Sequence, residues 1–266
     1  MEGVRIPAEQ VIPLEAIAEG VRGLRITFVN VFAVSQPDGG WVLIDAGVPL
    51  SASYIRKWAE DTLGSPPRAI VLTHGHFDHV SAADELAKHW SVPIYAHPEE
   101  FPYLTGKESY PPPNIGAGGG LMSVLSPLYP RGPIDLSPWL RALPDSGELT
   151  ELPDWRIIHT PGHTPGHVSL FRASDHVLLP GDAFCTTKPE SFFEAALAQQ
   201  PELHGPPAYF TSDWQAARRS VQQLAGLRAS TVAPGHGRPL TGPEVSAALE
   251  RLAAEFSEAA VPENRR

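Results

Sequence analysis

Four side chains that can bind a transition metal lie within six consecutive positions of the chain: His74, His76, Asp78 and His79. Neutral imidazoles and carboxylates are the nitrogen and oxygen ligands that divalent transition metals take in proteins. The motif directly follows an apolar run at 69–72, which is typical of a short buried strand. We therefore expect a metal site in the loop at the end of this strand.

Three later segments, 160–167, 179–182 and 233–236, also present His or Asp beside a Gly or Pro turn. Such turns let the backbone bend sharply and approach an ion closely. Together the four loops supply seven candidate ligands: His74, His76, Asp78, His79, His163, Asp182 and His236. Seven ligands exceed the four of tetrahedral zinc and indicate two ions that share a bridging carboxylate. His159 and His167 flank His163 and remain alternatives to it, with His167 favoured as a residue that supports a ligand.

In their order these motifs resemble the metallo-β-lactamase-fold hydrolase superfamily, and within it the glyoxalase II and lactonase type. The resemblance extends over about residues 21–240. It implies an α/β fold, a four-layer αββα sandwich, and we expect one such domain over residues 1–266. It further implies that one ion is held by His74, His76 and His163, the other by Asp78, His79 and His236, with Asp182 bridging.

The segment 43–47 resembles the first signature motif of that superfamily, in which an aspartate orients the metal ligands. Asp45 is the matching residue here, and an ordinary turn after a strand is its alternative interpretation. Lactonases of the superfamily usually carry a tyrosine three positions after the bridging aspartate, where this chain has Cys185. We expect Phe184, Cys185 and Tyr110 to contact the substrate, with a buried packing role as the alternative for Cys185.

Five imidazoles, two carboxylates and two divalent ions would make a positively charged site that attracts carbonyl, carboxylate or phosphate oxygen. Water bound to such ions ionises near pH 7. We therefore expect a binuclear hydrolase whose bridging hydroxide attacks the carbonyl of an ester, lactone or thioester. In this scheme the catalytic residues are Asp182, between the ions, and Asp78, which carries a proton to the leaving group. Zinc is the expected metal, with manganese, iron and cobalt as alternatives.

Other classes of protein use the same motifs. A metal-dependent phosphodiesterase or nuclease is the first alternative. A mononuclear iron oxygenase of the persulfide dioxygenase type is less favoured, because the second ligand set is complete. A secreted β-lactamase and a purely structural metal protein are the remaining alternatives, and structural zinc sites are closed and four-coordinate.

The amino-acid composition indicates which kind of partner to expect. The chain has 266 residues with 30 acidic and 20 basic side chains, a formal net charge of -10, and no basic cluster. Nucleic acid is therefore not the expected partner, and a small-molecule substrate is. No apolar run reaches 18 residues, so no membrane span is expected. The single cysteine and the lack of a basic, then apolar, N-terminal segment favour the cytoplasm.

Hydrophobic periodicity predicts alternating strands and helices around the motifs. The predicted strands are 26–34, 41–44, 92–96, 155–159, 168–171, 177–179 and 230–233. The predicted helices are 51–63, 81–90, 99–105, 121–128, 213–224 and 241–259, the last with Thr241 as its cap. Residues 106–144 are rich in proline and glycine. We interpret them as a lid-like insertion over the substrate, with a flap for a homodimer as the alternative.

Overall fold

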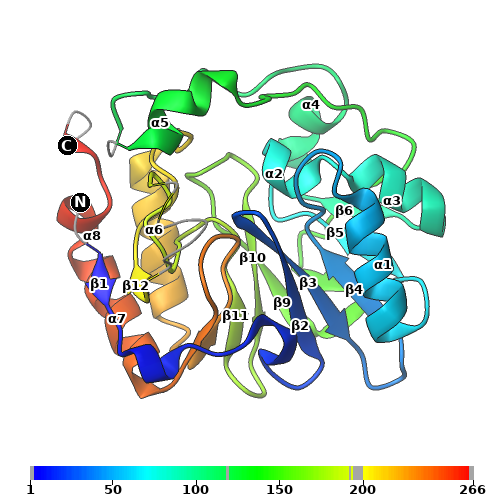
Figure 1. Cartoon of the computed structure of the whole chain (residues 1–266), viewed down its shortest axis with the longest axis horizontal. Helices are drawn as coiled ribbons and strands as arrows, with labels where there is room; N and C mark the ends of the chain where they lie inside the picture. Colours follow the sequence, from blue (N-terminus) through cyan, green and yellow to red (C-terminus); the bar gives the residue numbers. More distant parts are fainter. Residues whose placement is uncertain (1–2, 118–119, 192, 194–199, 264–266) are drawn as a thin grey trace.

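Two mixed β-sheets pack face to face in the computed structural model, and helices cover their outer faces (Figure 1). The structure describes residues 3–117, 120–191, 193 and 200–263. Helices α1 and α3 lie on one outer face, and helices α6 and α7 lie on the other (Figure 1). The predicted four-layer αββα sandwich is confirmed.

In the first sheet the strand order is β2-β3-β4-β5-β6-β7. Pairing is antiparallel from β2 to β4 and parallel from β4 to β7. The bounds are β2 (Val21–Ile26), β3 (Val29–Ser35), β4 (Trp41–Ile44), β5 (Ala69–Val71), β6 (Ile94–Ala96) and β7 (Leu140–Ala142).

The second sheet has the order β14-β13-β11-β10-β9-β8. Only β11 and β13 pair in parallel; the other described neighbours are antiparallel. The bounds are β8 (Glu148–Leu149), β9 (Leu152–His159), β10 (Val168–Arg172), β11 (Val177–Leu179), β13 (Thr231–Val232) and β14 (Leu240–Thr241). A small separate pair joins β1 (Val4–Arg5) to β12 (Glu202–Leu203).

The helices follow the predicted periodicity closely. Their bounds are α1 (Ala52–Leu63), α2 (Phe77–Val80), α3 (Ala83–Trp90), α4 (Phe101–Leu104), α5 (Leu121–Leu125), α6 (Trp214–Ala225), α7 (Pro243–Ala254) and α8 (Phe256–Ala259). Asp213 caps α6 by accepting hydrogen bonds from two backbone N–H groups of the first turn. Within the described residues, none of these helices is long and apolar enough to cross a membrane.

Strand β4 illustrates why strands of the first sheet are continuous apolar runs in the sequence. Successive side chains of a strand point to opposite faces, and both faces of this sheet are covered. Trp41 and Leu43 pack in the cluster under α1 and α3. Val42 and Ile44 pack between the two sheets, in a cluster that also holds Leu170 of the second sheet. The sandwich therefore has a core on each side of the sheet, and both cores need apolar residues.

Three sequence predictions about the elements were wrong in detail. The strand expected at 26–34 is β3, which begins only at Val29, because a turn at Thr27, with φ of 61°, separates it from β2, whose last residue is Ile26. Thr241 belongs to β14, and Gly242 precedes the helix in its place. The helix expected at 241–259 is interrupted at Glu255, between α7 and α8. Each error lies at a boundary, where local periodicity carries least information.

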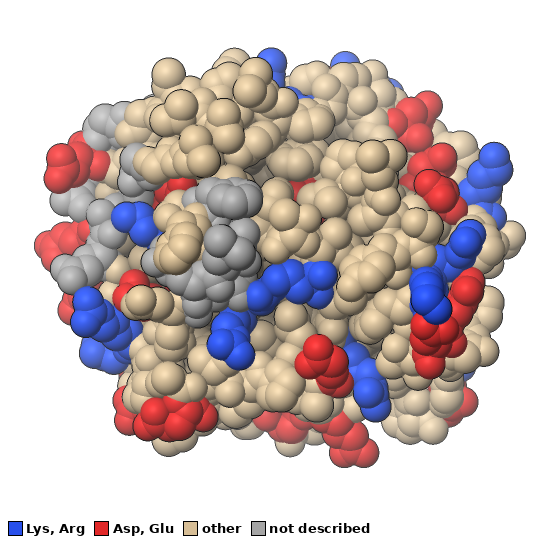
Figure 2. All heavy atoms as spheres, in the orientation of Figure 1, with Lys and Arg blue, Asp and Glu red and all other residues tan. Residues whose placement is uncertain are grey.

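Charged side chains on the viewed face are mixed in sign. Figure 2 shows Lys and Arg side chains separated by Asp, Glu and uncharged residues, without a continuous basic patch on this face.

Candidate metal centre

The candidate ligands follow strands that run in the same direction. In the first sheet β4 and β5 are parallel and are followed by Asp45 and by the His74 loop. In the second sheet β9 and β11 are each antiparallel to β10, and β13 is parallel to β11. Their ends lead to His163, Asp182 and His236. Hydrogen bonds connect each group of loops to a strand of the other sheet, from Val168 N of β10 to Thr73 O at 2.9 Å and from Asn30 N of β3 to Gly235 O at 2.8 Å.

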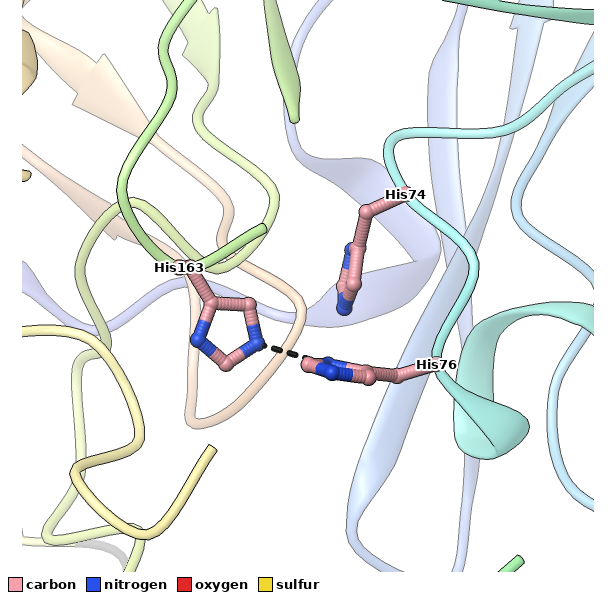
Figure 3. Close-up of side chains that lie close together, drawn as sticks. All are labelled: His74, His76 and His163. Carbon is pink, nitrogen blue, oxygen red and sulfur yellow. Dashed lines mark hydrogen bonds between the residues drawn. The ribbon is translucent and has the colours of Figure 1, made fainter. Parts of the chain in front are cut away.

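Three buried histidines from two sheets point toward one another (Figure 3): His74, His76 and His163. Their ligand atoms lie within 4.8 Å of each other. His76 Nδ1 faces His163 Nε2 at 2.9 Å. This arrangement can hold one metal ion through three nitrogen atoms.

A second buried group consists of Asp78, His79 and His236. Both Asp78 and His79 lie on the short helix α2, and His236 follows β13. His236 Nε2 lies 3.4 Å from Asp78 Oδ2, and the ligand atoms of the group lie within 4.8 Å. This set offers two nitrogen ligands and one oxygen ligand.

Asp182 lies between the two groups. Its Oδ1 is 3.5 Å from His79 Nε2, and its Oδ2 is 3.6 Å from His163 Nε2 and 3.1 Å from His236 Nε2. One carboxylate therefore contacts histidines of both sets, the geometry required of a bridging ligand. The structure thus brings together all seven candidate ligands of the sequence analysis.

Hydrogen bonds outside the cluster orient four of the ligand rings. His74 Nδ1 lies 3.0 Å from Thr73 Oγ1, and His163 Nδ1 lies 3.1 Å from Thr211 Oγ1. The two threonine hydroxyls donate their hydrogen atoms to other acceptors, to Asp45 and to Pro207 O. Each ring nitrogen is therefore the donor in its bond to the threonine. His79 Nδ1 donates to Asp45 and His236 Nδ1 donates to Phe28 O. In each ring this leaves Nε2 as the ligand atom that faces the cluster.

Asp45 and His167 hold this arrangement from outside it. Asp45 is buried, accepts from Thr73 N at 2.8 Å, and binds His79 Nδ1 at 2.8 Å. His167 Nε2 accepts from Asp182 N at 2.9 Å, and its Nδ1 bonds Thr160 Oγ1. Asp45 therefore contacts a candidate ligand ring, and His167 contacts the backbone of another candidate ligand.

The residues fit a pair of metal ions by two further observations. Buried polar atoms normally have a hydrogen-bond partner. His74 Nε2 has none and faces the cluster, and His79 Nε2 and Asp182 Oδ1 have no hydrogen-bond partner besides each other's charge, at 3.5 Å. A Cβ at Gly235 would lie 2.3 Å from Asp182 Oδ1, so only glycine lets the backbone come this close.

The histidines of the first group are held neutral. Burial lowers the pKa of His76 to about 4, and burial with the neighbouring imidazoles lowers the pKa values of His74 and His163 well below the usual value. Neutral imidazole is the form that binds a metal, so this group is ready to bind at neutral pH.

The second group behaves in the opposite way. Burial alone would lower the pKa of His236, but the charge of Asp182 and hydrogen bonds to Asp182 and Asp78 raise it to about 10. Burial likewise disfavours the cation of His79, yet Asp182, Asp45 and Asp78 raise its pKa well above the usual value. Without metal, protons therefore occupy this group.

A third cluster on the surface does not have the geometry of a metal site. His97, Glu99 and His159 offer ligand atoms within 4.8 Å, but the His97 and His159 rings stack at 4.0 Å with an interplanar angle of 11°. The in-plane lone pairs of two stacked rings lie in nearly parallel, separate planes, so they do not converge on one ion. His159 Nε2 also donates to Pro165 O at 2.8 Å. His159 thus lies outside the buried centre.

The predicted substrate contacts lie in different places. Tyr110 lines a cavity beside His76 and His163. Phe184 is fully buried in the hydrophobic cluster under α6 and α7. Cys185 is also fully buried, and its backbone bonds His204. Neither of these two is among the described residues that line this cavity.

A buried glutamate that no sequence motif had indicated joins two of the ligand loops. Glu100 Oε2 accepts from Gly75 N at 2.9 Å, and its Oε1 accepts from Gly166 N at 2.7 Å. Tyr110 donates its hydroxyl to the same carboxylate. Gly75 lies between His74 and His76, and Gly166 is three residues from His163. Glu100 therefore sets the spacing of the loops that carry the first group.

Replacing Glu100 by glutamine is expected to weaken metal binding at the first group by roughly 10- to 100-fold. The amide would turn a donor toward one of the two backbone N–H groups, which loses a hydrogen bond and loosens one loop. The measurement is competition for Zn²⁺ with a coloured chelator, with circular dichroism to verify folding. Glu99→Gln changes the neighbouring exposed glutamate and is the matched control. Equal affinity in both variants would contradict this role.

Comparison with known proteins found a matching family model and similar proteins. A family model described as "Metallo-beta-lactamase superfamily" matches residues 24–236. A curated relative, "Probable metallo-hydrolase YflN" of Bacillus subtilis (strain 168), is 47% identical over 244 residues, which cover 90% of this chain and 92% of the relative.

Two solved structures are similar along most of the chain. The B3 metallo-beta-lactamase BLEG-1 matches with a TM-score of 0.58 and 27% identity, over 85% of this chain and 96% of that chain. TTHA1623, solved in a di-iron-bound form, matches with a TM-score of 0.57 and 26% identity, over the same shares of 85% and 96%.

Proposed function

The chain belongs to the metallo-beta-lactamase superfamily, and from this premise we propose that it is a binuclear metal-dependent hydrolase of esters, lactones or thioesters. The coarser description, a probable metallo-hydrolase with a buried His and Asp cluster, rests on the curated relative and on the cluster itself. The finer description adds the number of ions and the bond that is cleaved.

The observation that carries the proposal is the position of Asp182. Its two oxygen atoms face histidines of both ligand sets, so one carboxylate can serve two ions. Two divalent ions bound there would lower the pKa of water to near 7 and polarise a carbonyl oxygen. A buried structural zinc site, by contrast, needs four ligands and leaves no position for water.

Within this reaction the protein groups have distinct tasks. Asp45, Phe28 and Thr211 hold the ligand rings so that the ligand nitrogen atoms converge. Asp78 is 7% exposed, which makes it the most accessible of the seven ligands. The charges of His79 and His236 and a hydrogen bond from His236 outweigh its burial and lower its pKa, so it is ionised at neutral pH. A carboxylate so placed can accept a proton and pass it to a leaving group.

The remaining parts of the proposal are zinc as the metal, a small-molecule substrate, a cytoplasmic location and a place in the glyoxalase II and lactonase branch. Imidazole and carboxylate ligands support zinc, but they also suit iron, which TTHA1623 contains. A homodimer through residues 106–144 stays a prediction, as does a lid formed by this segment. The net charge of -10 and the mixed charge on the face viewed in Figure 2 support a small molecule over nucleic acid.

The test is a parallel panel of initial rates with the metal-loaded protein and a metal-free blank. The panel holds an acyl-homoserine lactone, a simple lactone, an aryl ester, an acyl-glutathione thioester and an aryl phosphodiester. We expect metal-dependent turnover of at least one carbonyl substrate. Turnover of the phosphodiester alone would overturn the proposal and assign the protein to phosphodiester chemistry.

A further inference from the structure

A cavity of about 260 Å³ opens beside His76 and His163, the ligands of the first group. Its wall includes four aromatic residues from two distant parts of the chain: Tyr103, Tyr110, Tyr209 and Phe210. Small-molecule sites usually measure roughly 300–1,000 Å³. The cavity therefore suits a group about the size of one ring, and its position beside two metal ligands places that group next to the reacting bond.

The aromatic wall begins at the metal ligand itself. The His76 ring lies 4.6 Å from the Tyr110 ring and 4.7 Å from the Phe210 ring, measured between centroids. Tyr103 stacks on Tyr110 at 3.9 Å, and Tyr209 contacts Phe210 at 5.0 Å. These mutual contacts hold the rings in place, and aromatic surfaces prefer a flat ring as a partner.

The lining of the cavity carries no formal charge. None of its described residues is Asp, Glu, Lys or Arg, and its polar side chains besides His76 and His163 are tyrosines, Asn114, Thr211 and Ser212. The Tyr110 hydroxyl is donated to Glu100, and the Thr211 hydroxyl to Pro207 O. A carboxylate on the part of the ring that faces away from His76 and His163 would lose water without gaining an opposite charge from these side chains, which is costly.

From the size, the aromatic wall and the missing charge we infer that the preferred substrate carries one flat, uncharged aromatic ring close to the scissile carbonyl. This inference rests on the proposed hydrolase function and deepens it, because it names the substrate class. It disfavours glutathione thioesters, whose carboxylates need cationic partners.

The test compares esters that differ in the ring alone. Methyl phenylacetate and benzyl acetate place the ring on the acyl and leaving sides, methyl acetate lacks it, and methyl (4-carboxyphenyl)acetate adds a charge. We expect kcat/KM to be at least about tenfold higher for a ring-bearing ester than for methyl acetate. The value for methyl (4-carboxyphenyl)acetate should fall back to that of methyl acetate. Phe210→Ala should reduce the ratio, whereas Tyr54→Ala, at an exposed tyrosine of α1, should leave it unchanged.

A binding measurement separates this inference from the hydrolase proposal. Phenylacetamide and acetamide are titrated into the metal-loaded protein by calorimetry, which needs no turnover. Tighter binding of phenylacetamide, weakened by Phe210→Ala, supports the aromatic site even if every ester is inert. Equal binding of both amides together with equal rates for ringed and ringless esters would overturn the inference and leave the hydrolase function standing.

Discussion

Replacing Asp182 by alanine is expected to remove the second metal ion and to reduce turnover by more than about 100-fold. Changing a residue that merely supports a metal ligand costs up to about 100-fold, and losing a shared ligand should cost more. Asp182 contacts His79, His163 and His236 from between the two sets. Without the Asp182 carboxylate, no shared anion would offset the electrostatic repulsion between two divalent ions held close together. Binding of the second ion would therefore be unfavourable. Metal content by atomic emission and initial rates on the best substrate are the measurements.

Asp61→Ala is the control for this experiment. Asp61 lies on α1 in an exposed ion pair with Lys57, and such pairs contribute little to stability. Its metal content and rate should match those of the unchanged protein. If Asp182→Ala lost metal but kept its full rate, the binuclear mechanism would be wrong. A melting curve for each variant distinguishes loss of metal from loss of fold.

The second large effect is a difference in proton release between the two metal sites. The first ion should bind to His74, His76 and His163 without releasing protons, because burial already keeps these rings neutral. The second ion must displace protons from His79 and His236, whose pKa values are raised, that of His236 to about 10. Protons and metal compete for the same nitrogen atoms.

The sign of the pH dependence follows from these directions. Between pH 6 and 8 the solution is below the raised pKa of His236, so the ring is protonated in the metal-free protein. Raising the pH then favours the second ion, by up to about tenfold per pH unit for each proton displaced. Calorimetric titration with Zn²⁺ in buffers of different ionisation enthalpy counts the protons. If both equivalents of Zn²⁺ bound with the same number of protons released, or with none, the expected difference between the two metal sites would be wrong.

His236→Ala provides the matched variant for this titration. It removes a ligand of the second group and leaves the first group intact, so one ion should still bind without proton release. His89→Ala, at a histidine half exposed on α3, should behave as the unchanged protein does.

The candidate ligand set could be proposed from local sequence patterns, and the fold class from the family resemblance that these patterns carry. His74, His76, Asp78 and His79 lie within one short segment, and each later ligand follows an apolar strand through a Gly or Pro turn. Strand ends that share a direction lie at one edge of a sheet, so local order along the chain was enough to predict convergence. The continuous apolar runs of β4 and β5 likewise reflect burial on both faces.

The choice among His159, His163 and His167 needed the tertiary structure. All three lie in one segment with similar neighbours, and the strand pairing of β9 with β10 separates them. His159 ends β9 on the exposed side, His163 turns into the centre, and His167 binds the backbone of Asp182. The periodicity of a strand ends where its loop begins, so sequence spacing does not specify where a loop side chain points.

Asp45, His167 and Tyr110 were predicted from the sequence, but only the tertiary structure identified the other groups that support the ligands and shape the cavity. Glu100 is one acidic residue in a short helical turn, and the acceptor for His236 is a backbone carbonyl, that of Phe28. The aromatic wall joins Tyr110 to Phe210 across about a hundred residues of sequence, with the ring of His76 between them. Such contacts form between segments that are distant along the chain, so they leave no period or motif, and packing alone decides them.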